Sequence, residues 1–307
     1  MRKRRITDVG ASVRQRLLNL AKQRNEDFGL VLSRYAIQRL LYRLSRSPYA
    51  EDFILKGAQL FSLWTELPHR TTRDLDLLSQ GSPALDRLET VFRNVCEQHV
   101  DLPDGLTFEA SSVRTETIRE AAPYDGVRVL VGYEIGGARD RLQIDIGFGD
   151  AVIPAPEMAT IPALLDMPAP RLRVYPMEAV VAEKYEAMVS LGMANSRMKD
   201  FYDVWALARR FAFSGDRLCQ AIRATFTRRK TPVPVDLPVA LSSDFSSDRE
   251  KQVQWRAFLG RSRLPAEPDL DAVVDELRGF LWQPTSALAA DESFPMAWSP
   301  AKRWQPL

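Results

Sequence analysis

The sequence predicts an α+β protein in which the N-terminal half joins a mixed β-sheet to helices and the C-terminal half is all-helical. Three stretches support this prediction. Apolar residues recur at helical spacing over residues 10–47, alternate with polar ones within 106–148, and return to helical spacing from residue 177. The 307 residues, 45% hydrophobic and 27% charged, suffice for one large domain or two modest ones and are typical of a globular protein.

The N-terminal half reads as helices followed by strands. Gly136-Gly137 interrupts the alternating region, which predicts an antiparallel hairpin. The expected elements are two helices within 10–47, a short apolar segment at 53–55, a helix over about 57–66, a strand over 73–78, a helix ending near 98, and the hairpin over 127–148.

The C-terminal half carries helix signals. Pro176 opens one helix, and Asn195-Ser196 can cap the next. Helices are expected over 177–191, to about 210, over about 216–227, near 248–259 and near 270–282, with a Pro-rich linker at 231–238. We therefore expect N-terminal helices (1–47), a core (48–170), a helical domain (171–285) and a tail (286–307). Trp298 and Trp304 of the tail are expected to pack on the body or to be partly disordered, and the alternative is stacking on bases or binding a partner.

Composition excludes several classes of protein. No apolar run approaches the roughly 20 residues of a membrane span, nor does any segment resemble a signal sequence. Cys96 and Cys219 lie in apolar helical patterns, so neither a disulfide framework nor a metal-binding spacing is expected. We expect a cytoplasmic protein with no membrane partner. The net charge is only +2, but the basic residues cluster at 2–5, at 70 and 73, at 171 and 173, and at 228–230. Such patches could hold a nucleic acid locally or could be ordinary solvated charge.

Two carboxylates mark the principal candidate site. Asp74 and Asp76 lie one residue apart on the expected strand, so their side chains share a face while Leu75 points to the other. Paired hard oxygen ligands on a rigid support suit Mg²⁺ with bound phosphates. The Lys56-Gly57 turn precedes a helix whose N-terminus could bind phosphate.

A third carboxylate is expected from a neighbouring strand. Asp145 alternates with Leu142, Ile144 and Ile146, which places it on the non-core face of the hairpin. Asp145 would then be the metal ligand nearest the nucleophile and a possible general base, and the alternative is an exposed strand carboxylate.

Lys184 is a second candidate site, and the segment from Arg197 to Asp203 is a separate candidate. Lys184 lies within an apolar helical stripe, so its charge must reach water or meet an anion, for which phosphate is the natural choice. Arg197 near a helix start suits phosphate, because the helix dipole there disfavours a cation. Asp200 and Asp203 share one helix face, and Lys199 with Asp203 could instead be a surface ion pair.

Taken together, these motifs resemble the AbiEii/MenT family of bacterial toxin nucleotidyltransferases, which are DNA-polymerase-β-like enzymes. The resemblance covers roughly residues 10–285. The motifs that carry it are Phe53-Ile54-Leu55-Lys56-Gly57-Ala58, Arg70-x-Thr72-x-Asp74-Leu75-Asp76-Leu77, Glu183-Lys184, Arg197-x-Lys199-Asp200-x-x-Asp203, Thr225-Phe226-x-Arg228-Arg229 and Gln254-Trp255-x-x-Phe258-Leu259.

This resemblance implies a nucleotidyltransferase-like fold and a toxin that uses Mg²⁺ to move a nucleotide from an NTP onto RNA, the tRNA 3′ acceptor end foremost, blocking translation. It implies an antitoxin protein as partner. By motif, Asp74 and Asp76 bind metal, Lys184 contacts the triphosphate, and Asp200 or Asp203 acts near the reaction centre. Ala58 departs from the wider superfamily, which has a phosphate-contacting serine there.

The residues therefore predict three sets of roles. Whether Asp145, Asp200 or Asp203 supplies the third acidic group stays open, as do the preferred NTP, the acceptor and the oligomeric state. One rival interpretation is transfer to a protein or small-molecule hydroxyl, and another is a non-catalytic nucleotide-binding module. The predicted sets are metal ligands Asp74, Asp76 and Asp145; catalytic residues Asp74, Asp76, Asp145, Lys184, Asp200 and Asp203; and nucleotide-binding residues Lys56, Gly57, Ala58, Arg70, Thr72, Arg73, Lys184 and Arg197.

Overall fold

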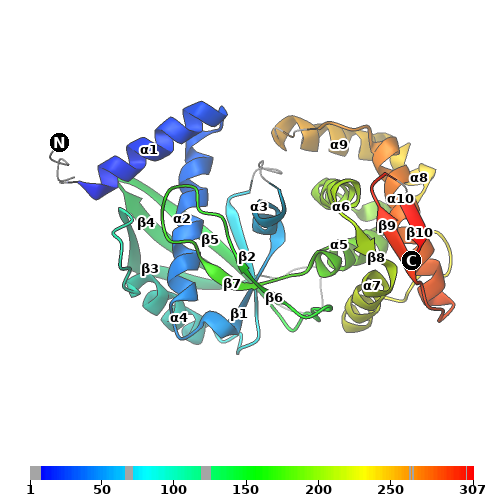
Figure 1. Cartoon of the computed structure of the whole chain (residues 1–307), viewed down its shortest axis with the longest axis horizontal. Coiled ribbons are helices and arrows are strands. Elements are labelled where there is room, and N and C mark those ends of the chain that lie inside the picture. Colours follow the sequence, from blue (N-terminus) through cyan, green and yellow to red (C-terminus); the bar gives the residue numbers. More distant parts are fainter. Residues whose placement is uncertain (1–7, 66–71, 119–125, 263, 265, 302) are drawn as a thin grey trace. The chain divides into compact units, whose positions relative to one another are not determined.

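The computed structural model describes residues 8–65, 72–118, 126–262, 264, 266–301 and 303–307 (Figure 1). The described chain forms two compact units. The first comprises residues up to 149 together with 157–174, and the second comprises 150–156 together with 175–307. Arg70 and the basic cluster at 2–5 lie outside the described residues. None of the described helices combines the length and apolar character needed to cross a bilayer.

The first unit is built on a seven-stranded mixed sheet with strand order β3-β4-β5-β2-β1-β7-β6. β2 runs parallel to β5 and β1 runs parallel to β7, while the other neighbours are antiparallel. The strands are β1 (Phe53–Lys56), β2 (Asp74–Ser79), β3 (Leu106–Ile118), β4 (Gly126–Ile135), β5 (Ala138–Phe148), β6 (Glu157–Thr160) and β7 (Arg171–Val174).

Helices cover the apolar face of this sheet. α1 (Val9–Arg24) begins at Asp8 and α2 (Phe28–Ser45) begins at Asp27, each capped by a carboxylate that accepts a backbone N–H. α2 contacts β5 and β7, and α4 (Leu85–Glu97) contacts β3 and β4 (Figure 1). Phe92 of α4 meets Phe53 of β1 edge to face, with ring centroids 5.7 Å apart. The expected helices within 10–47, the helix ending near 98 and the hairpin are confirmed.

The segment after β1 differs from the expected single helix. A 3₁₀ turn, η2 (Gly57–Leu60), is followed by one α-helical turn, α3 (Phe61–Trp64), and Gly57 has a φ of +73°. The helix dipole at Gly57 is therefore weaker than the sequence suggested, because few aligned peptide units follow it. Strands β6 and β7 were not foreseen, since four residues are too few for a periodic signal.

The second unit is mainly helical. Pro176 is the N-cap of α5, and Ser214 caps α7 by accepting a hydrogen bond from the backbone N–H of Arg217. A small sheet of strand order β10-β9-β8 adds to the helices that the sequence predicted. The elements are α5 (Met177–Leu191), α6 (Met198–Arg210), β8 (Phe213–Ser214), α7 (Gly215–Arg229), α8 (Ser243–Ser246), α9 (Arg249–Ser262), α10 (Leu270–Ala289), β9 (Met296–Ser299) and β10 (Arg303–Pro306), with short 3₁₀ turns η3 (Gly192–Ala194) and η4 (Val239–Leu241). The α+β fold class is confirmed.

The tail packs onto its own unit through two buried tryptophans. Pro284 lies inside α10 and has no N–H to donate to the carbonyl of Phe280. Trp304 Nε1 donates to that carbonyl at 2.9 Å, and its ring stacks on Phe280 with centroids 5.8 Å apart. With this carbonyl satisfied, α10 runs to Ala289, beyond the end expected near residue 282. Trp298 and Trp304 are 1% and 8% exposed, so neither is available to stack on bases.

Candidate active site

The acidic residues of the first unit form a row across the centre of the sheet. Asp76 on β2 lies directly beside Asp145 on the parallel strand β5, and Lys56 on β1 lies directly opposite Asp76 on the other side. Neighbouring strands are about 4.8 Å apart, so the three side chains share one face. Leu75 and Leu77 are fully buried on the opposite face, as the alternation predicted.

Gly57 leaves the space that Asp76 occupies. A β-carbon built on Gly57 would lie 2.6 Å from Cγ and 2.7 Å from Cβ of Asp76, well inside van der Waals contact. The positive φ of Gly57 also favours glycine, because an L-residue is strained there. The Lys56-Gly57 turn predicted from the sequence therefore lies against one of the two paired carboxylates.

Asp145 is held by an arginine that sequence reasoning missed. Arg128 on β4 donates from Nε to Oδ1 of Asp145 at 2.9 Å and from Nη2 to Oδ2 at 3.0 Å. The amide of Gln143 donates to Oδ2 at 3.1 Å. These hydrogen bonds to Asp145 are the main cause that raises the pKa of Arg128. The signal was the Gly136-Gly137 turn of the predicted hairpin, because a two-residue turn fixes the register that sets Arg128 on β4 opposite Asp145 on β5.

The donor set of this row fits Mg²⁺, although the described residues contain no preformed group of three metal-binding side chains. Mg²⁺ in proteins is commonly held by one or two carboxylates together with substrate phosphates and water, so a complete protein cage is not required. Asp76 with Asp74 or Asp145 meets that need, and the missing side chain of Gly57 leaves room for the carboxylate of Asp76. Mg²⁺ bound there would neutralise phosphate charge and polarise the reacting oxygens.

Other predicted nucleotide-binding residues lie near β2. Arg73, with a side chain 65% exposed, immediately precedes the strand, and its Nη2 is 3.9 Å from Oδ1 of Asp27. Thr72 makes a long contact of 3.5 Å from Oγ1 to the carbonyl of Asp74. Ala58 lies within the 3₁₀ turn η2. The nucleotide contacts of these residues stay predictions.

The second unit contains the other predicted cluster. Lys184 Nζ lies 2.6 Å from Oδ1 of Asp200 and 2.8 Å from Oδ2 of Asp203, and Arg197 Nε donates to Oδ2 of Asp200 at 2.7 Å. Asp200 and Asp203 are 1% and 0% exposed. Burial alone would raise the pKa of Asp200, but the charges of Lys184 and Arg197 outweigh it and hold that pKa below its ordinary value.

The structure thus brings Lys184 together with Arg197, Asp200 and Asp203, which come from two separate motifs of the sequence. The anion that Lys184 needs is supplied in the structure by carboxylates, whereas the sequence suggested phosphate. The alternative surface pair of Lys199 with Asp203 is not formed, since Asp203 is buried and Lys199 is exposed. A triphosphate contact of Lys184 stays a prediction.

A second charged cluster lies beside Lys184 and was also missed. Arg229 at the end of α7 approaches three carboxylates, with Nη1 2.8 Å from Glu186 and Nη2 3.6 Å from both Glu183 and Asp150. Thr231 Oγ1 donates to Glu186 at 2.6 Å. The three-residue spacing of Glu183 and Glu186 was the available signal, because it places both on one face of α5.

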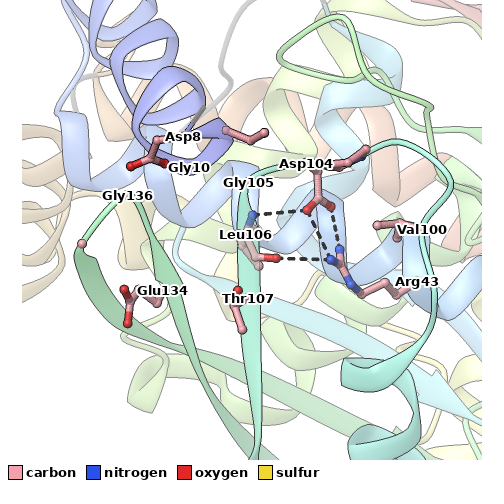
Figure 2. Close-up of a pocket in the computed structure, with 13 residues that line it drawn as sticks. Asp8, Gly10, Arg43, Val100, Asp104, Gly105, Leu106, Thr107, Glu134 and Gly136 are labelled. Carbon is pink, nitrogen blue, oxygen red and sulfur yellow. Dashed lines mark hydrogen bonds and ion pairs between the residues drawn. The ribbon is translucent and has the colours of Figure 1, made fainter. Parts of the chain in front are cut away.

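A separate pocket of about 510 Å³ opens in the first unit, and none of the predicted site residues lines it (Figure 2). Arg43 in its wall donates to both oxygens of Asp104, at 2.7 and 3.2 Å, and Arg39 donates to Asp104 at 3.0 Å. Both arginines and Asp104 are buried, so this cluster ties α2 to the chain before β3.

Comparison with known proteins identifies the family. Over residues 39–276 the sequence matches the family described as nucleotidyl transferase AbiEii toxin, type IV toxin–antitoxin system. No curated protein matches the sequence. The crystal structure of JHP933 from Helicobacter pylori is 15% identical, with a TM-score of 0.46 and coverage of 90% of this chain and 93% of its own. A candidate nucleotidyltransferase from H. pylori is 14% identical, with a TM-score of 0.44 and coverage of 92% and 95%. Because the family match spans most of the sequence, the resemblance is confirmed and the chain belongs to the AbiEii family of nucleotidyl transferase toxins.

Proposed function

We propose that this protein is a Mg²⁺-dependent nucleotidyltransferase that transfers a nucleoside monophosphate from an NTP to RNA. The acceptor we favour is the 3′ end of tRNA, whose modification would block translation in the cytoplasm until a cognate antitoxin counteracts the toxin. The observation that carries this proposal is the cross-strand pair of Asp76 and Asp145 beside Gly57. A binding module needs no such pair of adjacent carboxylates.

The residues of the row divide the work of the reaction. Asp74, Asp76 and Asp145 would hold Mg²⁺, and the backbone at Gly57-Ala58 with Lys56 would orient the triphosphate. The RNA hydroxyl oxygen forms a bond to the α-phosphorus while the bond from that phosphorus to the α–β bridging oxygen breaks, and pyrophosphate leaves. The hydroxyl proton passes to a carboxylate, for which Asp145 is the candidate in this unit.

The second unit supplies the remaining proposed contacts. Lys184 and Arg197 are the cations that we propose for the triphosphate, by the family motif. Because Asp200 and Asp203 already hold Lys184, phosphate oxygens would join or replace these carboxylates at its ammonium group. Asp203 is the alternative group for activating the hydroxyl.

The proposal is tested by incubating the protein with each of four α-labelled NTPs, Mg²⁺ and total bacterial tRNA. Asp76→Asn is the test variant, and Asp140→Asn, which changes an exposed aspartate on the same sheet, is its matched control. We expect label in tRNA with wild type and Asp140→Asn but not with Asp76→Asn. Label in protein or in a small molecule would move the acceptor to another class. If the protein neither binds nor turns over any NTP, the enzyme assignment is refuted.

A further inference from the structure

A rung of charged residues crosses five strands of the sheet, with two adjacent carboxylates between a lysine and an arginine. The strand registers place Lys56, Asp76, Asp145, Arg128 and Glu116 side by side, on β1, β2, β5, β4 and β3 respectively. Directly paired residues on neighbouring strands project from the same face. Arg128 is therefore the cation next to the proposed metal-binding carboxylates, and it has a carboxylate on either side.

The two carboxylates beside Arg128 are engaged unequally. Asp145 receives two charge-assisted hydrogen bonds, at 2.9 and 3.0 Å, in a bidentate arrangement. Glu116 lies 3.7 Å from Nη1 of Arg128, and its side chain is 58% exposed against 23% for Asp145. Glu116 is thus a second acceptor within reach that the guanidinium uses only weakly in this conformation.

This arrangement opposes a divalent cation at Asp145. A carboxylate offers about four acceptor positions, and Arg128 with Gln143 fills three of them on Asp145. The guanidinium charge also repels a dication at the same oxygens. A metal ion that uses Asp145 therefore competes with Arg128.

We infer that Arg128 is a positioning residue that holds Asp145 in the metal-free protein and moves to Glu116 when a divalent cation binds. This inference rests on the proposed function, because it assumes that Asp76 and Asp145 are metal ligands. The exchange needs only side-chain rotation, since Arg128 and Glu116 are directly paired across β3 and β4, where β-carbons are about 5 Å apart. The metal affinity is then set by the balance between the two carboxylate partners of Arg128.

The test measures Mn²⁺ binding to the whole chain in the absence of nucleotide. The electron paramagnetic resonance signal of free Mn²⁺ reports how much of the ion remains unbound. Arg128→Gln should bind Mn²⁺ about tenfold more tightly than wild type, because the competing cation is gone, and tenfold corresponds to about 1.4 kcal/mol. Glu116→Gln should bind about threefold more weakly, since Arg128 then has no alternative partner, on the scale of about 0.2–1 kcal/mol for exposed pairs. Arg128→Lys restores the positive charge and should return the affinity toward the wild-type value.

Arg139→Gln is the matched control, because Arg139 pairs with Glu134 at 2.8 Å across the same two strands, β4 and β5, nearer their connecting turn. Its Mn²⁺ affinity should equal that of wild type. An Arg128→Gln affinity equal to or weaker than wild type, while Asp76→Asn still abolishes binding, would overturn the exchange and leave the proposed function standing. No Mn²⁺ binding by wild type would overturn both. Circular dichroism in EDTA checks that each variant is folded. If Arg128→Gln does not fold, the variant Glu116→Gln still tests the inference, because Glu116 is exposed.

Discussion

Replacing Gly57 by alanine should damage the candidate site as well as the fold, and a second glycine separates the two effects. Gly57 has a φ of +73° and lies against Asp76. Gly137, in the turn between β4 and β5, has a φ of +77° and nothing within 4 Å of an added β-carbon. Gly57→Ala and Gly137→Ala therefore share the backbone strain, and only the former adds a collision.

The magnitude follows from these contacts. An L-residue in left-handed backbone costs about 1–2 kcal/mol, which applies to both variants. At Gly57 the new β-carbon would also lie 2.7 Å from the β-carbon of Asp76, and rotation about χ1 of Asp76 cannot move that atom. The ends of β1 and β2 must separate, and such overpacking costs about 1–3 kcal/mol more. We expect a total loss of about 2–5 kcal/mol for Gly57→Ala, from the sum of the two costs.

Urea unfolding and Mn²⁺ binding together measure the two effects. Gly137→Ala should lower the unfolding midpoint modestly and leave Mn²⁺ binding intact. Gly57→Ala should lower the midpoint further and weaken Mn²⁺ binding, because Asp76 is displaced from its position beside Asp145. Equal loss of stability in the two variants, with Mn²⁺ binding unchanged in both, would refute the role assigned to Gly57.

Three further predictions concern the second unit. Lys184→Met leaves Asp200 and Asp203 buried without their shared cation and should lower the free energy of unfolding by about 3 kcal/mol, measured in urea at pH 7. Because the folded-state pKa of Asp200 is lowered, ionisation of Asp200 stabilises the fold above about pH 4, and this stabilisation disappears as the pH falls through the folded-state pKa. Asp200→Asn should therefore make the free energy of unfolding less dependent on pH in the acid range. Trp304→Phe leaves the Phe280 carbonyl without its indole donor and should lower the free energy of unfolding by about 1–3 kcal/mol. The loss should be smaller in a Pro284→Ala background, where the backbone N–H of residue 284 can donate to that carbonyl. An equal cost in both backgrounds would contradict the account of how α10 passes Pro284.

Local patterns were sufficient to predict much of the fold. The period-two alternation around Asp74 and Asp76 predicted β2 to within a residue, and the Gly136-Gly137 turn predicted the hairpin of β4 and β5. The strands β6 and β7 were missed because four residues give little periodicity. The extent of α10 was missed because the donor that satisfies the Phe280 carbonyl comes from Trp304, far along the chain.

The candidate site shows the same division between local and long-range information. Side-chain parity placed Asp145 on the correct face of its strand, but only the parallel register of β2 with β5 sets it beside Asp76. The predicted Gly136-Gly137 hairpin contained the pairing of Arg128 with Asp145, but the pairing of Arg128 with Glu116 depends on the register of β3 with β4. The position of Lys184 in an apolar stripe correctly indicated an anionic partner, and tertiary packing decided that the partners in the structure are Asp200 and Asp203.

The central claim is that Asp76 and its neighbours carry nucleotidyl transfer. The most direct test measures pyrophosphate formed from NTPs with Mg²⁺ and a mixture of total RNA and protein as acceptors. Wild type and the exposed control Asp140→Asn should release pyrophosphate at equal rates, and Asp76→Asn should release none above background while keeping its fold. Release by Asp76→Asn at the wild-type rate would contradict the assignment of the active site to this row of the sheet.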